Sequence, residues 1–217
     1  ALDTVLAADL KDYKFYKTWV GRKLRKEHFL AIDADDIKLS VDPVFNVSLG
    51  RDQKNDRNVY VNTRGVLVMG NMHDKFYFYT GFHENQARYL SYVDSLVRKD
   101  SIVPGQGKVK FLDSEAFDFS QATGGVGYRA SRHFDFLLAN DKNFIGDGYR
   151  SLLLSDNTYS YPFFRIHMTF WKFRYSVYYM VLQNMRGGYD ENIGYTKKYS
   201  TMHYLDVNIG KKNSLTV

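Results

Sequence analysis

The chain has no cysteine and only 3 prolines among its 217 residues. Without cysteine, disulfides, thiolate nucleophiles and cysteine-ligated zinc or iron–sulfur sites are excluded. No apolar run approaches the roughly 20 residues of a spanning helix. The opening residues, ALDTVLAADL, lack the basic start and long apolar stretch of a signal peptide. Membrane-spanning strands would escape such tests, because their apolar residues alternate with polar ones.

Aromatic residues are abundant, with 18 tyrosines and 16 phenylalanines, and they favour pleated surfaces. An all-β chain is therefore expected. The net charge of +6 suits an anionic partner, but both signs are interleaved along most of the sequence, as on an ordinary solvated surface. The basic cluster RKLRK (22–26) stands alone, and no strand resembles an RNA-binding motif. We therefore expect no nucleic-acid partner.

Period-2 alternation of apolar and polar residues is the main structural signal. It predicts a strand from Ile37 to Leu49, in which Pro43 suggests a sheet edge or a bulge. Short separators at 131–133 and 171–172 join later strands without helical spacers, which is typical of an antiparallel meander. The expected strands cover 37–49, 58–70, 76–84, 122–130, 134–142, 163–171, 173–183 and 201–209, and residues 215–217 look like the start of another.

The N-terminal part differs from this pattern. Residues 11–29 place apolar side chains at helical spacing opposite lysines and arginines, which predicts a basic amphipathic helix. That helix could lie on a membrane surface or pack against the rest of the protein. The expected organisation is a helical segment over 1–33, followed by β-strands over 34–217. Two long connections, 91–120 and 140–162, interrupt the meander and are expected to be functional or disordered.

Several strands have the roughly 9–11 residues that a tilted strand needs to cross a bilayer. In the 163–171 strand, Phe164, Ile166 and Met168 form an apolar face, whereas Arg165 and His167 lie on the other. A transmembrane barrel and a soluble sandwich both produce this pattern. Aromatic residues near strand ends favour the membrane, because they resemble interfacial girdles. They are Phe76, Tyr77, Phe170, Trp171, Tyr199 and Tyr204.

Searches for catalytic and cofactor motifs give negative results. The stretch GDGYRS (146–151) lacks the third glycine and the Gly-Lys-Ser/Thr ending of phosphate loops. The six histidines show no metal-binding spacing, and no G-x-S-x-G elbow exists. We expect no enzyme, no cofactor and no metal. A hydrolase in which His167 or His203 serves a serine stays open as a remote alternative.

One loop gathers the remaining candidate residues. Aromatic rings stack on sugar faces, and an arginine fork such as that of Arg150 holds a carboxylate in bidentate fashion. Alternatively, these residues only order a long loop through turns and ion pairs, with Leu152–Leu154 pinning it. The candidates for ligand binding are Asp141, Lys142, Asp147, Tyr149, Arg150, Asp156 and Asn157.

DKNFIGDGYRSLLLSDN (141–157), together with YPFFRI, TFWKFRYSVYYM, YVNTRGVLVMG, FHENQ and VPGQGKVK, resembles the Wzi capsule-assembly family. The nearest branch is the RemB gliding-motility proteins of Bacteroidetes-type bacteria, and the similarity runs from about Trp19 to Met202. The resemblance implies a transmembrane β-barrel in the outer membrane, in contact with outer-membrane lipid. It also implies a lectin-like role in holding surface polysaccharide, for capsule assembly or adhesion.

This reading makes the chain an all-β antiparallel meander that forms part of an outer-membrane barrel, with a short N-terminal helical segment. Family barrels need more strands than the roughly eight that alternation predicts, so we expect the N-terminal part of a larger barrel. The alternative is a soluble or periplasmic β-sandwich that serves as an interaction module.

Overall fold

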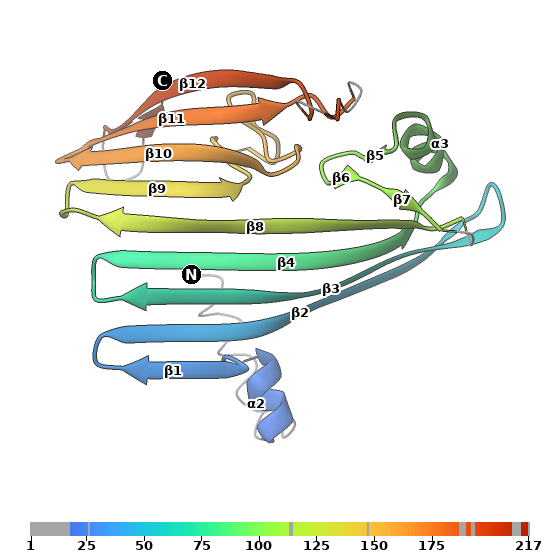
Figure 1. Ribbon diagram of the computed structural model, residues 1–217, viewed down its shortest axis with the longest axis horizontal. Coiled ribbons are helices and arrows are strands. Elements are labelled where there is room, and N and C mark those ends of the chain that lie inside the picture. Colours follow the sequence, from blue (N-terminus) through green and yellow to red (C-terminus); the bar gives the residue numbers. More distant parts are fainter. Residues whose placement is uncertain are drawn as a thin grey trace.

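The computed structural model describes residues 18–25, 27–112, 115–146, 148–186, 190–191, 194–209 and 214–216. Its main feature is an 11-stranded antiparallel sheet in the order β1-β2-β3-β4-β8-β9-β10-β11-β12-β13, with β7 paired to β8 (Figure 1). The predicted all-β antiparallel meander is confirmed. The strands are β1 Leu30–Ala34, β2 Ile37–Asp52, β3 Arg57–Met72, β4 Phe76–Arg88, β7 Lys110–Phe111, β8 Phe117–Arg129, β9 Phe134–Asp141, β10 Tyr161–Phe170, β11 Phe173–Gln183, β12 Lys197–Asn208 and β13 Ser214–Thr216.

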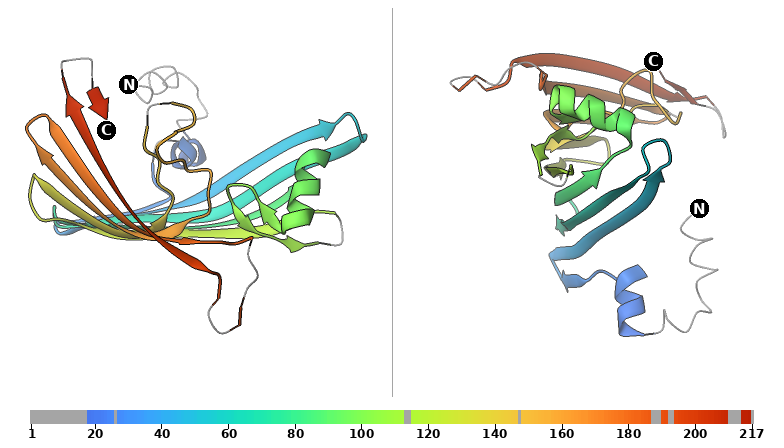
Figure 2. Two further views of the ribbon diagram at one scale, coloured as in Figure 1. Left: turned by 90° about the horizontal axis from the view of Figure 1, so that it is seen from above. Right: turned by 90° about the vertical axis from the view of Figure 1, so that its right-hand side faces the viewer.

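The sheet is strongly curved, and its two faces differ (Figure 2). The helix α3 (Ser91–Asp100) and the loop between β9 and β10 both lie on the concave side. Since side chains alternate along each strand, the register assigns every strand residue to one face. On β10, Phe164 and Ile166 lie on the convex face, and Arg165 and His167 lie on the concave face, as the alternation predicts.

The convex face is apolar and open. Leu138 on β9 and Val126 on β8 are cross-strand neighbours on this face, and their exposed fractions are 64% and 61%. Val177, on the same face, is only 5% exposed. We define the convex apolar face by its large exposed residues. They are Ile32, Phe45, Val47, Leu49, Val66, Phe78, Phe82, Val126, Leu138, Phe170, Phe173, Tyr175, Tyr179 and Tyr199.

The buried residues of the concave face form two separate clusters. One lies over β9–β11 and includes Leu137, Phe163 and Tyr178, with Ile145 of the β9–β10 loop packed onto them. The other lies beneath α3, where Val97 packs against Phe117 and other side chains of the strand ends. Burial on this face therefore depends on α3 and the loop, which cover it in place of a second sheet.

The structure differs from the sequence-based expectation in the segment 91–120. That segment was expected to be a connection with weak strand signals, but it contains α3, a hairpin of β5 (Ile102–Val103) and β6 (Gly107–Lys108), and β7. The helix ends at Ser101, whose positive φ of 53° stops helical propagation. The helix has only 10 residues, and it packs on the sheet through Val93 and Val97 with Asp94 buried beside them.

At the N-terminal end, the helix α2 spans Trp19–Arg25, and residues 11–17 of the predicted helix lie outside the described residues. β1 begins at Leu30, so the end of the predicted 1–33 helical segment belongs to the sheet. β1 pairs with β2 only as far as Val41, which leaves Pro43 on a free strand edge, as predicted. The expected final strand is also present, as β13 paired with β12.

Candidate functional site

The loop between β9 and β10 folds back over the concave face and closes on itself. The backbone N–H of Ile145 donates to the carbonyl of Leu154 at 2.9 Å, and both side chains pack against the β9–β11 cluster. Gly146 takes a φ of 138°, which favours glycine, where the Ser151 hydroxyl donates to the carbonyl of Ile145. The loop is thus a lobe anchored at 145 and 154.

Three of the predicted ligand residues hold the base of this loop. The hydroxyl of Tyr79 donates to Asp141 at 2.8 Å, and Lys142 Nζ donates to the carbonyl of Gly105 at 2.6 Å. Partial burial lowers the pKa of Lys142. Asn157 Oδ1 lies so close to Gly105 that a Cβ there would come within 2.5 Å. Lys142 and Asn157 therefore lie against the β5–β6 hairpin, whereas Asp141 connects the base of the loop to β4.

The tip of the loop carries a second group. Tyr149 is 94% exposed, and the guanidinium of Arg150 lies 5.8 Å from the centre of its ring. Leu152 is fully exposed, and only Leu154 of the three leucines packs inward. The structure therefore divides the predicted set into a structural base and an open aromatic–cationic tip. Asp156 is exposed beside the base, and Asp147 lies outside the described residues.

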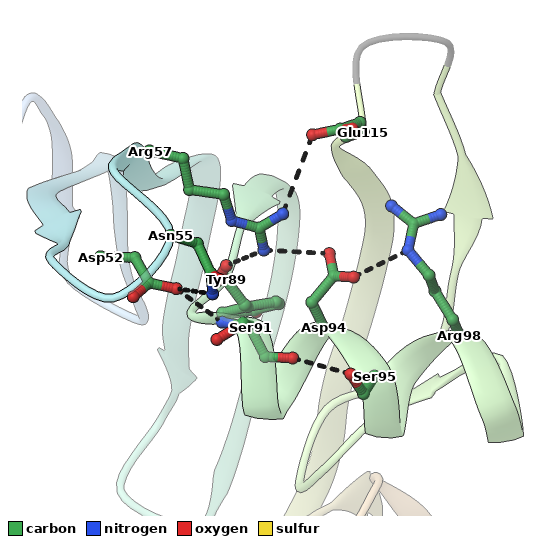
Figure 3. A network of polar contacts seen from close by, with 9 residues as sticks. All are labelled: Asp52, Asn55, Arg57, Tyr89, Ser91, Asp94, Ser95, Arg98 and Glu115. Carbon is green, nitrogen blue, oxygen red and sulfur yellow. Dashed lines mark hydrogen bonds and ion pairs between the residues drawn. The ribbon is translucent and has the colours of Figure 1, made fainter.

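A polar network fixes α3 to the adjacent strand ends (Figure 3). Arg57 donates to the carbonyl of Tyr89 at 2.6 Å and lies 3.4 Å from Asp94, which also pairs with Arg98 at 2.8 Å. Arg57 reaches Glu115 as well, at 3.8 Å. Because these partners come from β3, α3 and the segment before β8, the network stabilises the concave cap.

Asp52 holds the first turn of α3 and gives the cap a pH dependence. Its carboxylate accepts the backbone N–H of Ser91 at 3.1 Å and the amide of Asn55 at 3.2 Å, and these bonds lower its pKa from 3.8 to about 2. A lowered folded-state pKa stabilises the protein at pH values above the unfolded pKa, and this stabilisation is lost as the pH falls through the folded pKa.

We therefore expect α3 to loosen between pH 4 and pH 2, as measured by amide hydrogen exchange of residues 91–100. The Asp52→Asn variant should lose this pH dependence, because its amide does not titrate. Asp56→Asn, in the same turn but exposed, is the matched control and should behave like the parent. An unchanged exchange profile in Asp52→Asn would contradict the assignment.

Neither candidate histidine forms a hydrolytic relay in the described part of the chain. His203 contacts the hydroxyl of Tyr175 at 2.6 Å, on the convex face. His167 and Ser176 are cross-strand neighbours on the concave face, but neither His167 Nε2 nor Ser176 Oγ has a hydrogen-bond partner among the described residues. This geometry gives the hydrolase alternative no support.

Sequence reasoning missed a cluster of basic side chains on the concave face. Arg129, Arg165 and Arg174 come from three different strands, and Asp135 lies between the first two. The available signal was a charged residue at alternate positions of each strand. It could not be used without the register, which brings positions far apart in the sequence together.

Two absences complete the description. Within the described ranges, no group of three histidine or acidic residues is placed to hold a metal ion. No helix among those residues is long and apolar enough to cross a membrane.

Comparisons of the chain with family models, with characterised proteins and with solved structures find no match.

Proposed function

We propose that this chain forms part of the wall of an outer-membrane β-barrel that binds or anchors surface polysaccharide, as its resemblance to the Wzi and RemB proteins implies. One observation carries the proposal. The convex face exposes large apolar side chains on β2–β4 and β8–β12, with the Arg64–Glu84 ion pair among them, whereas α3 and the folded loop cover the concave face. Soluble monomers rarely expose such an apolar expanse. Contact with lipid accounts for it.

Strand lengths and turn lengths support the same proposal. β10, β11 and β12 have 10, 11 and 12 residues, close to the roughly 9–11 of a tilted spanning strand. Tight turns at 131–133 and 171–172 lie at one end of the sheet, and the long segments 89–116 and 142–160 lie at the other (Figure 1). Outer-membrane barrels have short periplasmic turns and longer outer loops. The loop tip would therefore face the cell exterior.

The second candidate is a soluble or periplasmic interaction module in which another sheet covers the convex apolar face. Carbonate extraction of membranes from producing cells separates the two proposals. Retention of the protein in the membrane pellet is expected for the barrel, because its lipid contacts are apolar and insensitive to high pH. Release into the supernatant would contradict the barrel and favour the sandwich.

We expect Tyr149→Ala and Arg150→Ala each to weaken glycan retention on cells about three- to tenfold, equivalent to roughly 0.7–1.4 kcal/mol for one lost stacking or charge-assisted contact. Both side chains are exposed, so folding should not change. Retention of labelled surface polysaccharide is the measurement, with the thermal unfolding midpoint measured in parallel.

The matched control is Tyr92→Ala on α3, where the tyrosine is 67% exposed but lies outside the loop. It should retain glycan like the parent. Normal folding with unchanged retention in both loop variants would end the binding hypothesis for this loop. Loss of folding in both would instead assign the tip a structural role.

A further inference from the structure

A second cluster of charged residues lies on the concave face at the opposite end of the strands from the loop tip. We call Arg129, Arg132, Arg165 and Arg174 the basic cluster. Arg129 ends β8, Arg132 lies in the β8–β9 turn, and the other two come from β10 and β11. All except Arg165 line a cavity of about 420 Å³, whose wall also includes His133, Asp135, His167 and Thr169.

Acidic partners only partly neutralise this cluster. Asp135 lies 3.5 Å from Arg165 and 3.9 Å from Arg129, and it also accepts the hydroxyl of Tyr77 at 2.9 Å. Asp206 is the cross-strand neighbour of Arg174. Two carboxylates therefore face four guanidinium groups, and the cavity keeps a positive excess that attracts anions.

The turn holds Arg132 in a fixed orientation. His133 Nδ1 is 2.8 Å from the carbonyl of Thr169, to which it donates, so its Nε2 accepts from Arg132 Nε at 3.0 Å. His133 thus binds one edge of the guanidinium. The terminal nitrogens of Arg132, which form the bidentate fork, have no partner among the described residues and stay available for an anion.

Three polar atoms next to the cavity are buried and have no hydrogen-bond partner among the described residues. Ser176 is 0% exposed, and its hydroxyl has no hydrogen-bond partner in the described part of the chain. Nε2 of its neighbour His167, which lines the cavity, and Nε of Arg165 are also buried without a hydrogen-bond partner among the described residues. Each of these three atoms is itself buried, so a ligand in the cavity would contact His167 and Arg165 only through their other, exposed atoms.

We propose that the basic cluster binds the carboxylate or phosphate groups of an acidic saccharide chain. The inference rests on the proposed function, and with the orientation given there it places a contact with the polysaccharide inside the barrel, at its periplasmic end. Guanidinium forks match both acidic groups in bidentate geometry.

The test uses the purified full chain in detergent micelles and three probes: an oligogalacturonate, the neutral maltoheptaose, and inorganic phosphate. Calorimetric titration should detect binding of the oligogalacturonate but not of maltoheptaose. The double variant Arg132→Gln/Arg174→Gln should raise its Kd at least tenfold. Arg132→Gln alone, at an exposed turn where folding is not at risk, should raise it at least threefold.

The control pair Lys54→Gln/Lys110→Gln removes the same charge from exposed positions at the far end of the sheet and should leave Kd unchanged. Equal weakening by both pairs would reduce the effect to net charge and overturn the site. Phosphate binding as tight as that of the oligogalacturonate would overturn the saccharide assignment. If neither the oligogalacturonate nor phosphate bound, both the anion site and its saccharide assignment would be overturned.

These outcomes are independent of the membrane and glycan-retention tests. Carbonate extraction reports on insertion of the sheet in the membrane. The Tyr149 and Arg150 variants report on glycan binding by the loop tip. The arginine variants report only on the basic cluster. A chain that stays in the membrane and binds oligogalacturonate equally well with and without the cluster would refute this inference alone.

Discussion

Replacing Leu138 with arginine should destabilise the membrane-inserted protein by about 2–4 kcal/mol, the cost measured for arginine near the bilayer midplane of barrels. Leu138 lies in the middle of β9 on the convex apolar face and is 64% exposed. In water, arginine at such an exposed position would change stability by no more than about 0.5 kcal/mol. Urea unfolding in lipid vesicles therefore reports directly on the surroundings of the convex face.

Leu49→Arg is the matched control. Leu49 is 83% exposed on the same face, but it lies towards the end of β2 that extends to α3, away from the tight turns. Its substitution should cost about 0–1 kcal/mol, as near a membrane interface. Val126→Arg, opposite Leu138, should behave like Leu138→Arg. Full tolerance of arginine at positions 126 and 138 would be incompatible with lipid contact there.

Alanine at Gly65 is the second substitution for which we expect a large effect, a loss of about 1–3 kcal/mol of unfolding free energy from overpacking. A Cβ at this position of β3 would lie 2.3 Å from the carbonyl oxygen of Phe82 on β4. That oxygen belongs to the backbone, so it cannot move without disturbing the β3–β4 ladder. The lower conformational entropy of unfolded alanine offsets only about 0.4–1 kcal/mol.

Gly50→Ala on β2 provides the comparison, because its nearest obstacle is a side-chain methyl of Val59 at 3.2 Å and not a backbone atom. We expect a change of no more than about 0.5 kcal/mol there, as for an ordinary surface substitution. Urea unfolding followed by tryptophan fluorescence measures both variants. If Gly65→Ala were as stable as Gly50→Ala, the close approach of β3 and β4 at this position would be disproved.

The hairpins could be predicted from sequence because their signals are local. Alternation over Ile37–Leu49 and the short separator at 171–172 each specify a strand or a turn without reference to the rest of the chain. The same alternation correctly separated Ile166 from His167 on opposite faces of β10. β1 was not predicted as a strand, because it has only 5 residues and was assigned to the helical segment that precedes it.

The concave face could not be predicted, because it depends on register and on tertiary contacts. Arg129 and Arg165 approach the same carboxylate only through the β8–β9 and β9–β10 pairings. The position of α3 depends on contacts with residues far away in the chain, because Val97 packs on the strand ends and Asp52 and Arg57 bind its first turns. The candidate loop was located correctly as a segment. Its division into a base at Lys142 and a tip at Tyr149 required coordinates.

The pairing of β4 with β8 has a consequence for how the sheet assembles. Every other neighbouring pair along the sheet joins strands that follow each other in the chain, so each can form as a hairpin from its own connection. β4 and β8 meet only after residues 89–116 have closed into a loop, which costs chain entropy. The sheet is therefore two hairpin-built halves joined at one seam. The segment that carries α3 is the covalent link between the two halves, and the β4–β8 ladder makes them a single sheet.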